Sequence, residues 1–380
     1  MLADSGGIDT AAEISRQPDL WTRTFTLVSR DKERLREFLN RAISSPHCDI
    51  ILTGAGSSAF IGDSLHCTMQ EKLDRNVKAI PTTSLVSHPG SYFRKDIPTL
   101  MVSFARSGDS PESVAAVSRA NSICRTVHHL VITCNPHGKL ASACRPGKDL
   151  VFLLPPESND KGLAMTGSFT SMLLAGLLIS HLSRLESHGK YVELLADYGR
   201  HLISHHAGDL RSIADVDFSR AVFLGSGPLQ GIARESHLKL QELTAGTIIC
   251  KHDSYLGFRH GPKAVIDAST LLVYLLTNNT SAAPYEIDLA RDIERTGGAM
   301  FTAGVSEHRV DRIRMDLRIE LAGSGKDCLP EEYLAVVNVL PAQMLGFFKA
   351  LHLGLRPDTP AANGTITRVV TGVNIYPFDE

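Results

Sequence analysis

Two serines follow a glycine-rich turn at the start of a predicted helix. The turn, Gly54-Ala55-Gly56-Ser57-Ser58, comes directly after the apolar run 50–52. Glycines let a backbone approach a ligand closely, and the first turn of a helix offers unpaired N–H groups and the positive end of the helix dipole. The serine hydroxyls add further donors. The pattern therefore predicts a phosphate-binding turn with Ser57 and Ser58 as ligands.

Two other interpretations of this turn are open. Gly54, Gly56 and Ala59 also fit the spacing of a dinucleotide-binding motif. Such a site needs an acidic residue at the end of the next strand to hold the ribose, but the predicted strand 77–80 is followed by Pro81-Thr82-Thr83-Ser84. The remaining alternative is a plain strand-to-helix turn in which the serines only cap the helix. The sequence favours phosphate over both.

A second hydroxyl-rich turn follows another predicted strand, 99–104. It runs from Arg106 through Ser107 to Ser110 and leads into a helix with Pro111 at its first position, where proline is favoured. Ser110 can cap this helix and still contact an anion. Ligands of doubly wound sheets bind at the carboxyl ends of strands where the strand order reverses. We therefore expect Ser107 and Ser110 to face the first serine pair.

The two turns belong to a repeated pattern of strands and helices. Apolar strand-like runs occur at 49–52, 77–80, 99–104, 130–134 and 150–154. The pattern begins again near Arg220, with runs at 221–224, 247–250, 270–276, 299–303 and 315–320. Apolar strands separated by helices indicate parallel sheets covered on both faces. The sequence predicts an α/β fold of two tandem doubly wound parallel-sheet domains, each a three-layer α/β/α unit.

The predicted domain boundaries follow from this duplication. We expect an N-terminal helical segment over residues 1–46, a first domain over 47–205, a second over 206–354 and a C-terminal tail over 355–380. Near the boundary, His201, His205 and His206 interrupt the apolar periodicity. No carboxylate stands at a metal-ligand spacing from them, so they indicate a solvated linker and no metal site.

The second domain is expected to lack a phosphate site of its own. Its counterpart of the second turn, Thr277-Asn278-Asn279-Thr280, has no Ser-Gly pair. The sequence therefore predicts one phosphate site per chain, in the first domain.

Composition excludes several classes of protein. A formal net charge of −2 without a lysine or arginine run argues against nucleic-acid binding. The longest apolar block, 172–179, is too short to span a bilayer, so no membrane association is expected. Seven scattered cysteines without a C-x-x-C pair argue against disulfides or a zinc site and indicate a reducing cytoplasm.

Three longer motifs are more specific than a glycine-rich turn. They are AMTGSFTSM from Ala164, ESHLKLQELTAG from Glu235 and DSYLGFRHGP from Asp253. Together with the paired turns they resemble the galactosamine-6-phosphate deaminase/isomerase family, historically labelled tagatose-6-phosphate ketose/aldose isomerase. Members of this family carry tandem sugar isomerase (SIS) domains. The resemblance covers residues 9–380.

The resemblance implies a reaction. D-galactosamine 6-phosphate would be converted to D-tagatose 6-phosphate and ammonia by ring opening, enolisation and imine hydrolysis, with no metal or organic cofactor. The related glucosamine-6-phosphate synthase shares these motifs behind an amidotransferase domain, whereas only about 45 residues precede the first strand here. Without an ammonia source the chemistry is expected to run towards ammonia release. A non-deaminating aldose/ketose phosphate isomerase and a non-catalytic phosphosugar-sensing module remain as alternatives.

The resemblance also assigns roles to residues of the predicted helix 235–243. Glu242 matches the family's acid/base glutamate, which would move a proton between C2 and C1 of the sugar. Lys239 precedes Glu242 by three residues and Glu235 precedes it by seven, so all three lie on about the same helix face. Lys239 and Glu235 are expected to tune or orient Glu242.

Three further residues are expected near the sugar. His260, in the motif Arg259-His260-Gly261-Pro262, matches the family's ring-opening histidine, and imidazole can exchange a proton near neutral pH. Asp253 is a possible additional acid. The backbone around Leu163 matches a sugar-contacting loop. The resemblance further implies a homodimer, or a dimer of dimers, in which His260 reaches the neighbouring chain.

The sequence departs from the synthase pattern at two places. Synthases carry a lysine in the C-terminal tail that takes part in opening the ketose ring, but Thr365 stands there and no lysine follows Lys349. This difference fits a deaminase better. Ala105 stands where the synthase has a phosphate-binding serine, and we expect the neighbouring Arg106 to compensate by its charge.

Overall fold

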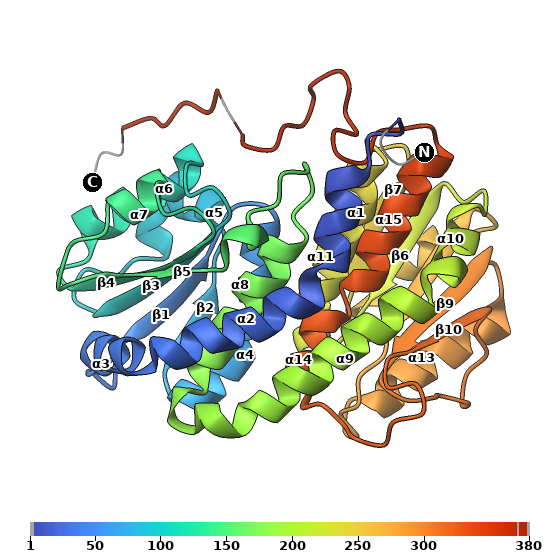
Figure 1. Cartoon of the computed structure of the whole chain (residues 1–380), viewed down its shortest axis with the longest axis horizontal. Helices are drawn as coiled ribbons and strands as arrows, with labels where there is room; N and C mark the ends of the chain where they lie inside the picture. Colours follow the sequence, from blue (N-terminus) through green and yellow to red (C-terminus); the bar gives the residue numbers. More distant parts are fainter. Residues whose placement is uncertain (1–3, 371, 378–380) are drawn as a thin grey trace. The chain divides into compact units, whose positions relative to one another are not determined.

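The computed structural model describes residues 4–370 and 372–377. The chain forms two compact units, each containing one five-stranded parallel sheet (Figure 1). We call them the first-sheet unit, residues 20–160, 167–189 and the described part of 364–380, and the second-sheet unit, residues 4–19, 161–166 and 190–363. The predicted fold of two tandem parallel-sheet units is confirmed.

In the first sheet the strand order reverses between the two strands that precede the predicted turns. Its strands are β1 (Asp49–Thr53), β2 (Asn76–Ala79), β3 (Thr99–Ala105), β4 (Val127–Thr133) and β5 (Leu150–Leu153), arranged in the order β2-β1-β3-β4-β5. Strand β1 pairs in parallel with β2 on one side and with β3 on the other. The turns after β1 and β3 therefore leave neighbouring strands at the same edge of the sheet.

Helices cover both faces of the first sheet. The helices α4 (Ser57–Leu73) and α8 (Gly167–Ser180) pack together on one face, while α5 (Thr82–Ser87), α6 (Pro111–Ile123) and α7 (Lys139–Ser142) lie on the other. Alternate strand residues such as Ile51, Met101 and Val131 are at most 1% exposed beneath this second helix layer. Burying each such side chain contributes about 1.5–3 kcal/mol. The edge that carries the turns is thus held by a well-packed core.

The second sheet repeats this topology. Its strands are β6 (Arg220–Leu224), β7 (Ile249–Asp253), β8 (Thr270–Leu275), β9 (Phe301–Ser306) and β10 (Leu317–Glu320), in the order β10-β9-β8-β6-β7. On one face, α11 (Pro228–Leu243) packs against α14 (Glu331–Val337) and α15 (Leu340–His352), and α15 against α10 (Ala207–Ala214). The other face is covered by α12 (Tyr255–Phe258) and α13 (Ala283–Thr296).

The remaining elements join and flank these layers. They are the helices α1 (Ile8–Ser15), α2 (Gln17–Arg30), α3 (Lys32–Ala42) and α9 (Gly189–His205), and the 3-10 turns η1 (Pro89–Ser91), η2 (Pro156–Ser158), η3 (Leu182–His188) and η4 (Pro262–Val265). The segment Glu331–His352 is apolar and long enough to cross a bilayer, but 89% of its most apolar window is buried inside the protein. It is a core helix pair of the second-sheet unit.

One sequence-based expectation was wrong. The boundary segment with His201, His205 and His206 was expected to be a solvated linker, but residues 200–218 contain the end of α9 and the whole of α10. Leu195, Leu202 and Leu210 are buried along these helices, so the apolar periodicity continues past the histidines. His206 also has a carboxylate partner, because its Nδ1 lies 2.9 Å from Oδ2 of Asp209.

Candidate active site

The glycine-rich turn after β1 has a backbone that requires glycine. Gly56 adopts φ 57° and ψ −130°, and a Cβ added to Gly54 would lie 2.5 Å from the Cβ of Ser58. Thr82 fixes this turn, since its N–H and its hydroxyl both donate to the carbonyl oxygen of Gly54, at 2.9 and 3.2 Å. Ser57 and Ser58 begin α4 and are only 5% and 4% exposed. The chain's own hydrogen bonds and close packing therefore hold the turn in this conformation.

The turn after β3 is held in a similar way. Asn135, which follows β4, donates from Nδ2 to the carbonyl oxygen of Ser107 at 2.8 Å. A Cβ at Gly138 would lie 2.4 Å from that same oxygen, so only glycine fits there. Ser107 Oγ accepts a hydrogen bond from the N–H of Asp109. Ser110 is at the N-cap position of α6 with Pro111 next, as predicted, but its side chain makes no capping hydrogen bond.

Three residues that fix these turns were missed by the sequence analysis. Thr82, Asn135 and Gly138 all act on turns that belong to other strands. No local motif marks such contacts, because they join segments that are distant in the sequence. The one signal in the sequence is their position, because Thr82 and Asn135 are polar residues that follow β2 and β4, and all parallel strands end at one edge.

Arg106 contacts the C-terminal tail. Its side chain is 7% exposed, and its Nη2 donates to the carbonyl oxygen of Arg368 at 2.6 Å. Arg368 in turn donates to the carbonyl oxygen of Asp160 and to Oδ1 of Asn159. The tail segment around Arg368 therefore lies against Arg106. We expected the charge of Arg106 to compensate for the serine that Ala105 replaces. The contact with Arg368 was not anticipated from the sequence.

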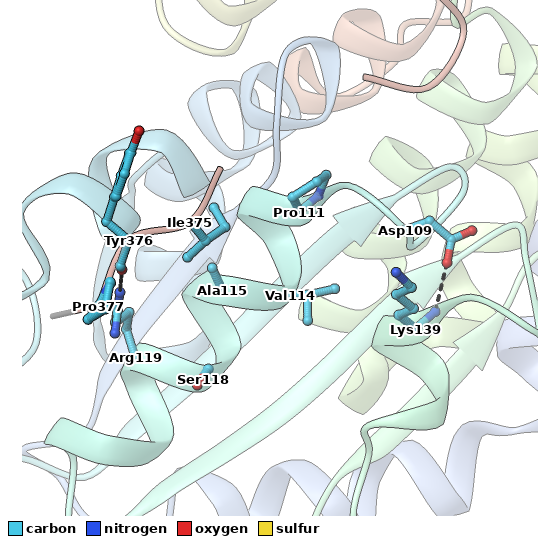
Figure 2. Close-up of a pocket in the computed structure, with 10 residues that line it drawn as sticks. All are labelled: Asp109, Pro111, Val114, Ala115, Ser118, Arg119, Lys139, Ile375, Tyr376 and Pro377. Carbon is cyan, nitrogen blue, oxygen red and sulfur yellow. Dashed lines mark hydrogen bonds between the residues drawn. The ribbon is translucent and has the colours of Figure 1, made fainter. Parts of the chain in front are cut away.

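A cavity of about 520 Å³ lies beside the second turn, between α6 and the tail (Figure 2). Arg119 of α6 donates from Nη2 to the carbonyl oxygen of Tyr376 at 2.6 Å and so ties the tail to the helix. Asp109 and Lys139 close one end of the cavity, where the N–H of Lys139 donates to Oδ1 of Asp109. Its lining includes Asp109 and Pro111 and none of the predicted phosphate ligands, so it lies beside the second predicted turn and apart from those side chains.

The predicted acid/base group lies on α11. Lys239 is completely buried and lies between two carboxylates, with Nζ 2.7 Å from Oε2 of Glu242 and 3.3 Å from Oε1 of Glu235. Burial opposes the charge of Lys239, but the two carboxylates outweigh burial and raise the pKa of the lysine above its ordinary value. Glu235 is fully buried, whereas the Glu242 side chain is 24% exposed. Of the three groups, only Glu242 reaches solvent.

Helix geometry explains why this triad forms. Residues three and four positions apart are neighbours on one helix face, which places both carboxylates next to Lys239. The helix α15 then covers the group closely, because a Cβ at Gly346 would lie 3.2 Å from the carbonyl oxygen of Lys239. The grouping of Glu235, Lys239 and Glu242 that the sequence predicted is present.

The other predicted sugar contacts lie elsewhere in the second-sheet unit. Asp253 ends β7, and its Oδ1 accepts from the N–H of Ser254. His260 is exposed in the turn between α12 and η4, followed by Gly261 at φ 113°. The N–H of Leu163 donates to the carbonyl oxygen of Asp358 at 3.1 Å. Within the residues that the structure describes, no hydrogen bond or ion pair joins Asp253 or His260 to Glu242.

Two histidines to which the sequence analysis gave no role lie in the second-sheet unit, as Glu242 does. His237 of α11 and His252 of β7 have ring centroids 4.7 Å apart. Burial lowers the pKa of both imidazoles, that of His252 to about 4, and the negative charge of Glu242 acts on His237 in the opposite direction. Both rings are therefore neutral at pH 7.

One group of possible metal ligands occurs among the described residues, away from the predicted site residues. Ligand-type atoms of Glu307, His308 and Cys328 lie within 4.8 Å of one another. Oε1 of Glu307 already accepts hydrogen bonds from the N–H of Leu329 and from the hydroxyl of Tyr198. We therefore assign Glu307 to holding the segment before α14, a structural role.

The chain is similar to known proteins over nearly its whole length. The SIS domain family matches residues 42–182. D-galactosamine-6-phosphate deaminase AgaS of Shewanella sp. (strain ANA-3) is 38% identical over 381 residues, which cover 99% of this chain and 94% of the relative. AgaS of Escherichia coli O157:H7 is 38% identical over 379 residues, with 99% and 97% covered.

Solved structures agree with these relatives. Tagatose-6-phosphate ketose/aldose isomerase of Escherichia coli superposes with a TM-score of 0.90 at 35% identity, covering 98% of this chain and 97% of that one. A Clostridium novyi protein, described as a candidate enzyme of the same name, gives 0.96 at 42% identity, with 99% and 97% covered. Fold and turns thus define a protein built from SIS-type units. The chain belongs to the AgaS family, which confirms the resemblance drawn from the motifs.

Proposed function

We propose that this protein converts D-galactosamine 6-phosphate and water to D-tagatose 6-phosphate and ammonia. The observation that carries the proposal is the buried Lys239 that donates to the partly exposed Glu242, in a chain that aligns with AgaS deaminases over 99% of its length. A protein that only senses a phosphosugar needs a phosphate site but no buried lysine beside a partly exposed carboxylate. The pair therefore supports an enzyme.

In this proposal the protein binds the substrate mainly through its phosphate group. We assign it to the hydroxyls of Ser57, Ser58, Ser107 and Ser110 and to the N–H groups of the two helix starts. Hydrogen bonds to a charged group contribute about 1.5–3 kcal/mol each, so a few of them suffice for micromolar binding. Arg106 contributes positive charge next to this site, and its contact with the tail supports an additional role in holding Arg368.

Glu242 is the proton shuttle in this proposal. In the open-chain sugar the C1 aldehyde acidifies the C2 hydrogen, and Glu242 removes that proton and returns it at C1. The amine nitrogen loses a proton and the C1 oxygen gains one, which leaves a hydroxyl at C1 and an imine at C2. Water then adds to the imine and ammonia departs. Lys239 keeps Oε2 of Glu242 in place, so Oε1 is the oxygen that we assign to the substrate. Glu235 balances the charge of Lys239 inside the protein.

Ring opening is assigned to His260. The reaction requires a group that moves a proton between the ring oxygen and the anomeric hydroxyl, and imidazole does so near neutral pH. Asp253 is the additional acid in this proposal, and the backbone at Leu163 contacts the sugar. Proton transfer beside a carbonyl and imine hydrolysis need neither a redox carrier nor a Lewis acid, so we propose no cofactor.

The assembly and location are part of the proposal. We propose a cytoplasmic homodimer, or a dimer of dimers, in which His260 acts on the site of the neighbouring chain. The exposure of His260 and the backbone conformation of Gly261, which directs its loop, support this arrangement.

Ammonia release from a panel of sugar phosphates tests the function. The purified protein is given galactosamine 6-phosphate, glucosamine 6-phosphate and N-acetylgalactosamine 6-phosphate, and ammonia is measured together with the ketose phosphate formed. We expect ammonia and tagatose 6-phosphate in equal amounts from the first substrate, without glutamine. Ketose formed from a neutral aldose phosphate, with no ammonia from any aminosugar, would instead support the non-deaminating isomerase. Binding without turnover of any of them would support the sensor.

A further inference from the structure

The second-sheet unit contains a copy of the glycine-rich turn. The turn is Gly225-Ser226-Gly227, between β6 and α11. Gly227 has φ 54° and ψ −129°, and its counterpart Gly56 has φ 57° and ψ −130°. A Cβ at Gly225 would collide with the carbonyl of Leu229, as one at Gly54 would with Ser58. The backbone that forms the first turn is therefore duplicated almost without change.

The facing turn is duplicated as well. Strand β6 pairs with β8 from Arg220 and Thr270 onward, as β1 pairs with β3 from Asp49 and Thr99. This register puts Thr277 at the place of Arg106, and Asn278 at the place of Ser107. The second-sheet unit thus has both halves of the frame that surrounds the phosphate in the proposed site.

The donors of this second frame are satisfied by glutamates of the chain itself. The Thr277 hydroxyl donates to Oε1 of Glu331, and Nδ2 of Asn279 donates to Oε2 of Glu331 at 3.2 Å. Nδ2 of Asn278 donates to Glu307 at 2.7 Å. Oε1 of Glu331 also lies 3.6 Å from where a Cβ at Gly227 would be, so its carboxylate is at the start of α11. An anion therefore already occupies the end of this helix, where negative charge is favoured.

A second carboxyl group, that of Glu286, lies beside the facing turn and is buried. Glu286 of α13 is 1% exposed, and its Oε2 accepts from the N–H of Thr277 at 2.9 Å. Its Oε1 has no hydrogen-bond partner among the residues that the structure describes, which is unusual for a buried carboxyl oxygen. Burial and the nearby charge of Glu331 raise the pKa of Glu286 to about 7, so Glu286 is mostly a neutral acid below about that pH.

We infer that the second-sheet unit contains a second anion-binding frame whose ligand is the carboxylate of Glu331. This internal ligand closes the frame to phosphate and limits each chain to one phosphosugar. It also fastens the start of α14 to the carboxyl edge of the second sheet. The inference does not depend on the proposed reaction, since it concerns a site that contains none of the proposed catalytic groups.

Removal of the internal ligand tests the inference. The variant Glu331→Ala is compared with the wild type and with Glu332→Ala, which deletes the neighbouring carboxylate on the same helix. Melting temperatures are measured in sodium sulfate and in sodium chloride of equal ionic strength, and sulfate binding is measured by titration calorimetry. We expect one more sulfate site per chain in Glu331→Ala only. At about ten times the dissociation constant, its melting temperature should rise by about 3–6 °C more than that of either control.

A second pair of variants separates the frame from a general loss of packing. Glu331→Gln keeps the shape and an acceptor oxygen, so it should still fill the site and show no additional sulfate binding. Thr277→Val in the Glu331→Ala background removes a donor of the frame and should abolish most of the gain. If Glu331→Ala responds to sulfate no more than the wild type does, or if the gain survives Thr277→Val unchanged, Glu331 is not the ligand of an anion frame and the inference is wrong.

Discussion

Replacement of Lys239 by methionine separates stability from catalysis at the centre of the proposed site. The lysine is fully buried between Glu235 and Glu242, and Glu235 is fully buried too. Methionine fills a similar volume but removes the positive charge that balances Glu235. Loss of one member of a buried ion pair typically destabilises a protein by about 3–5 kcal/mol. We expect a loss of this size for Lys239→Met in urea unfolding.

Lys239→Met should also lower kcat, independently of its effect on stability. Lys239 donates to Glu242 through a hydrogen bond between charged groups, of the kind that contributes about 1.5–3 kcal/mol. If that bond positions Glu242 in the transition state, kcat should fall by about 10- to 150-fold at temperatures where the variant is folded. The pKa of Lys239 lies above its value in the unfolded chain, so its contribution to stability is complete below the unfolded pKa. The wild-type contribution of Lys239 is therefore complete between about pH 6 and 9, and a destabilisation that changes over this range reports the buried Glu235 left without its partner.

Two controls make this prediction refutable. Lys349 is also a buried lysine, but it donates to the carbonyl oxygens of Ala214 and Val216, so Lys349→Met should lower stability and leave kcat unchanged. The double variant Glu235→Leu/Lys239→Met removes both buried charges and should recover most of the stability. It should not recover kcat. Wild-type stability in Lys239→Met, or full recovery of kcat in the double variant, would refute the assignment of Lys239 as the residue that positions Glu242.

Three further predictions concern the phosphate, the second frame and the assembly. Ser107→Ala should weaken binding of the phosphorylated sugar by roughly 10- to 150-fold in calorimetry and leave the unphosphorylated sugar unaffected; equal losses for both would remove this turn from the phosphate site. Since burial raises the pKa of Glu286 from 4.5 to about 7, folding favours its protonated form, and the wild type should lose about 3 kcal/mol of stability as pH rises from about 4.5 through 7. Glu286→Gln should lack that loss in urea titrations at each pH, and an unchanged profile would contradict the assignment. Mixing inactive Glu242→Gln and His260→Ala chains should restore roughly a quarter of the wild-type activity, because half of the dimers are mixed and each has one complete site; inactivity after chain exchange confirmed by mass spectrometry would place both residues in one chain's own site.

The sheets could be predicted because their signal is local. Each apolar run, such as 99–104, corresponds to one strand. The segment 200–218 was misjudged because its histidines interrupt the surface pattern and not the buried one, where Leu202 and Leu210 continue the helical period. The histidines therefore mark a short break between α9 and α10, and the segment is not a solvated linker.

The contacts that hold the site could not be predicted in the same way. The spacing of Glu235, Lys239 and Glu242 is local to one helix, so their grouping was visible in the sequence. Thr82 and Asn135 act across strands, and which loop each one contacts depends on the strand order and on the exact turn conformation. The domain boundaries stay a prediction, as do the roles of the site residues.

The measurement that tests the central claim most directly is ammonia release from galactosamine 6-phosphate by Glu242→Gln. The amide keeps the shape of the side chain but cannot accept the C2 proton. We predict that kcat falls by about 10²–10⁴-fold while the affinity for substrate, measured by calorimetry, stays near that of the wild type. Urea unfolding of the same preparation establishes that the variant is folded. Ammonia release at a near-normal kcat would contradict the account, because Glu242 would then not move the proton.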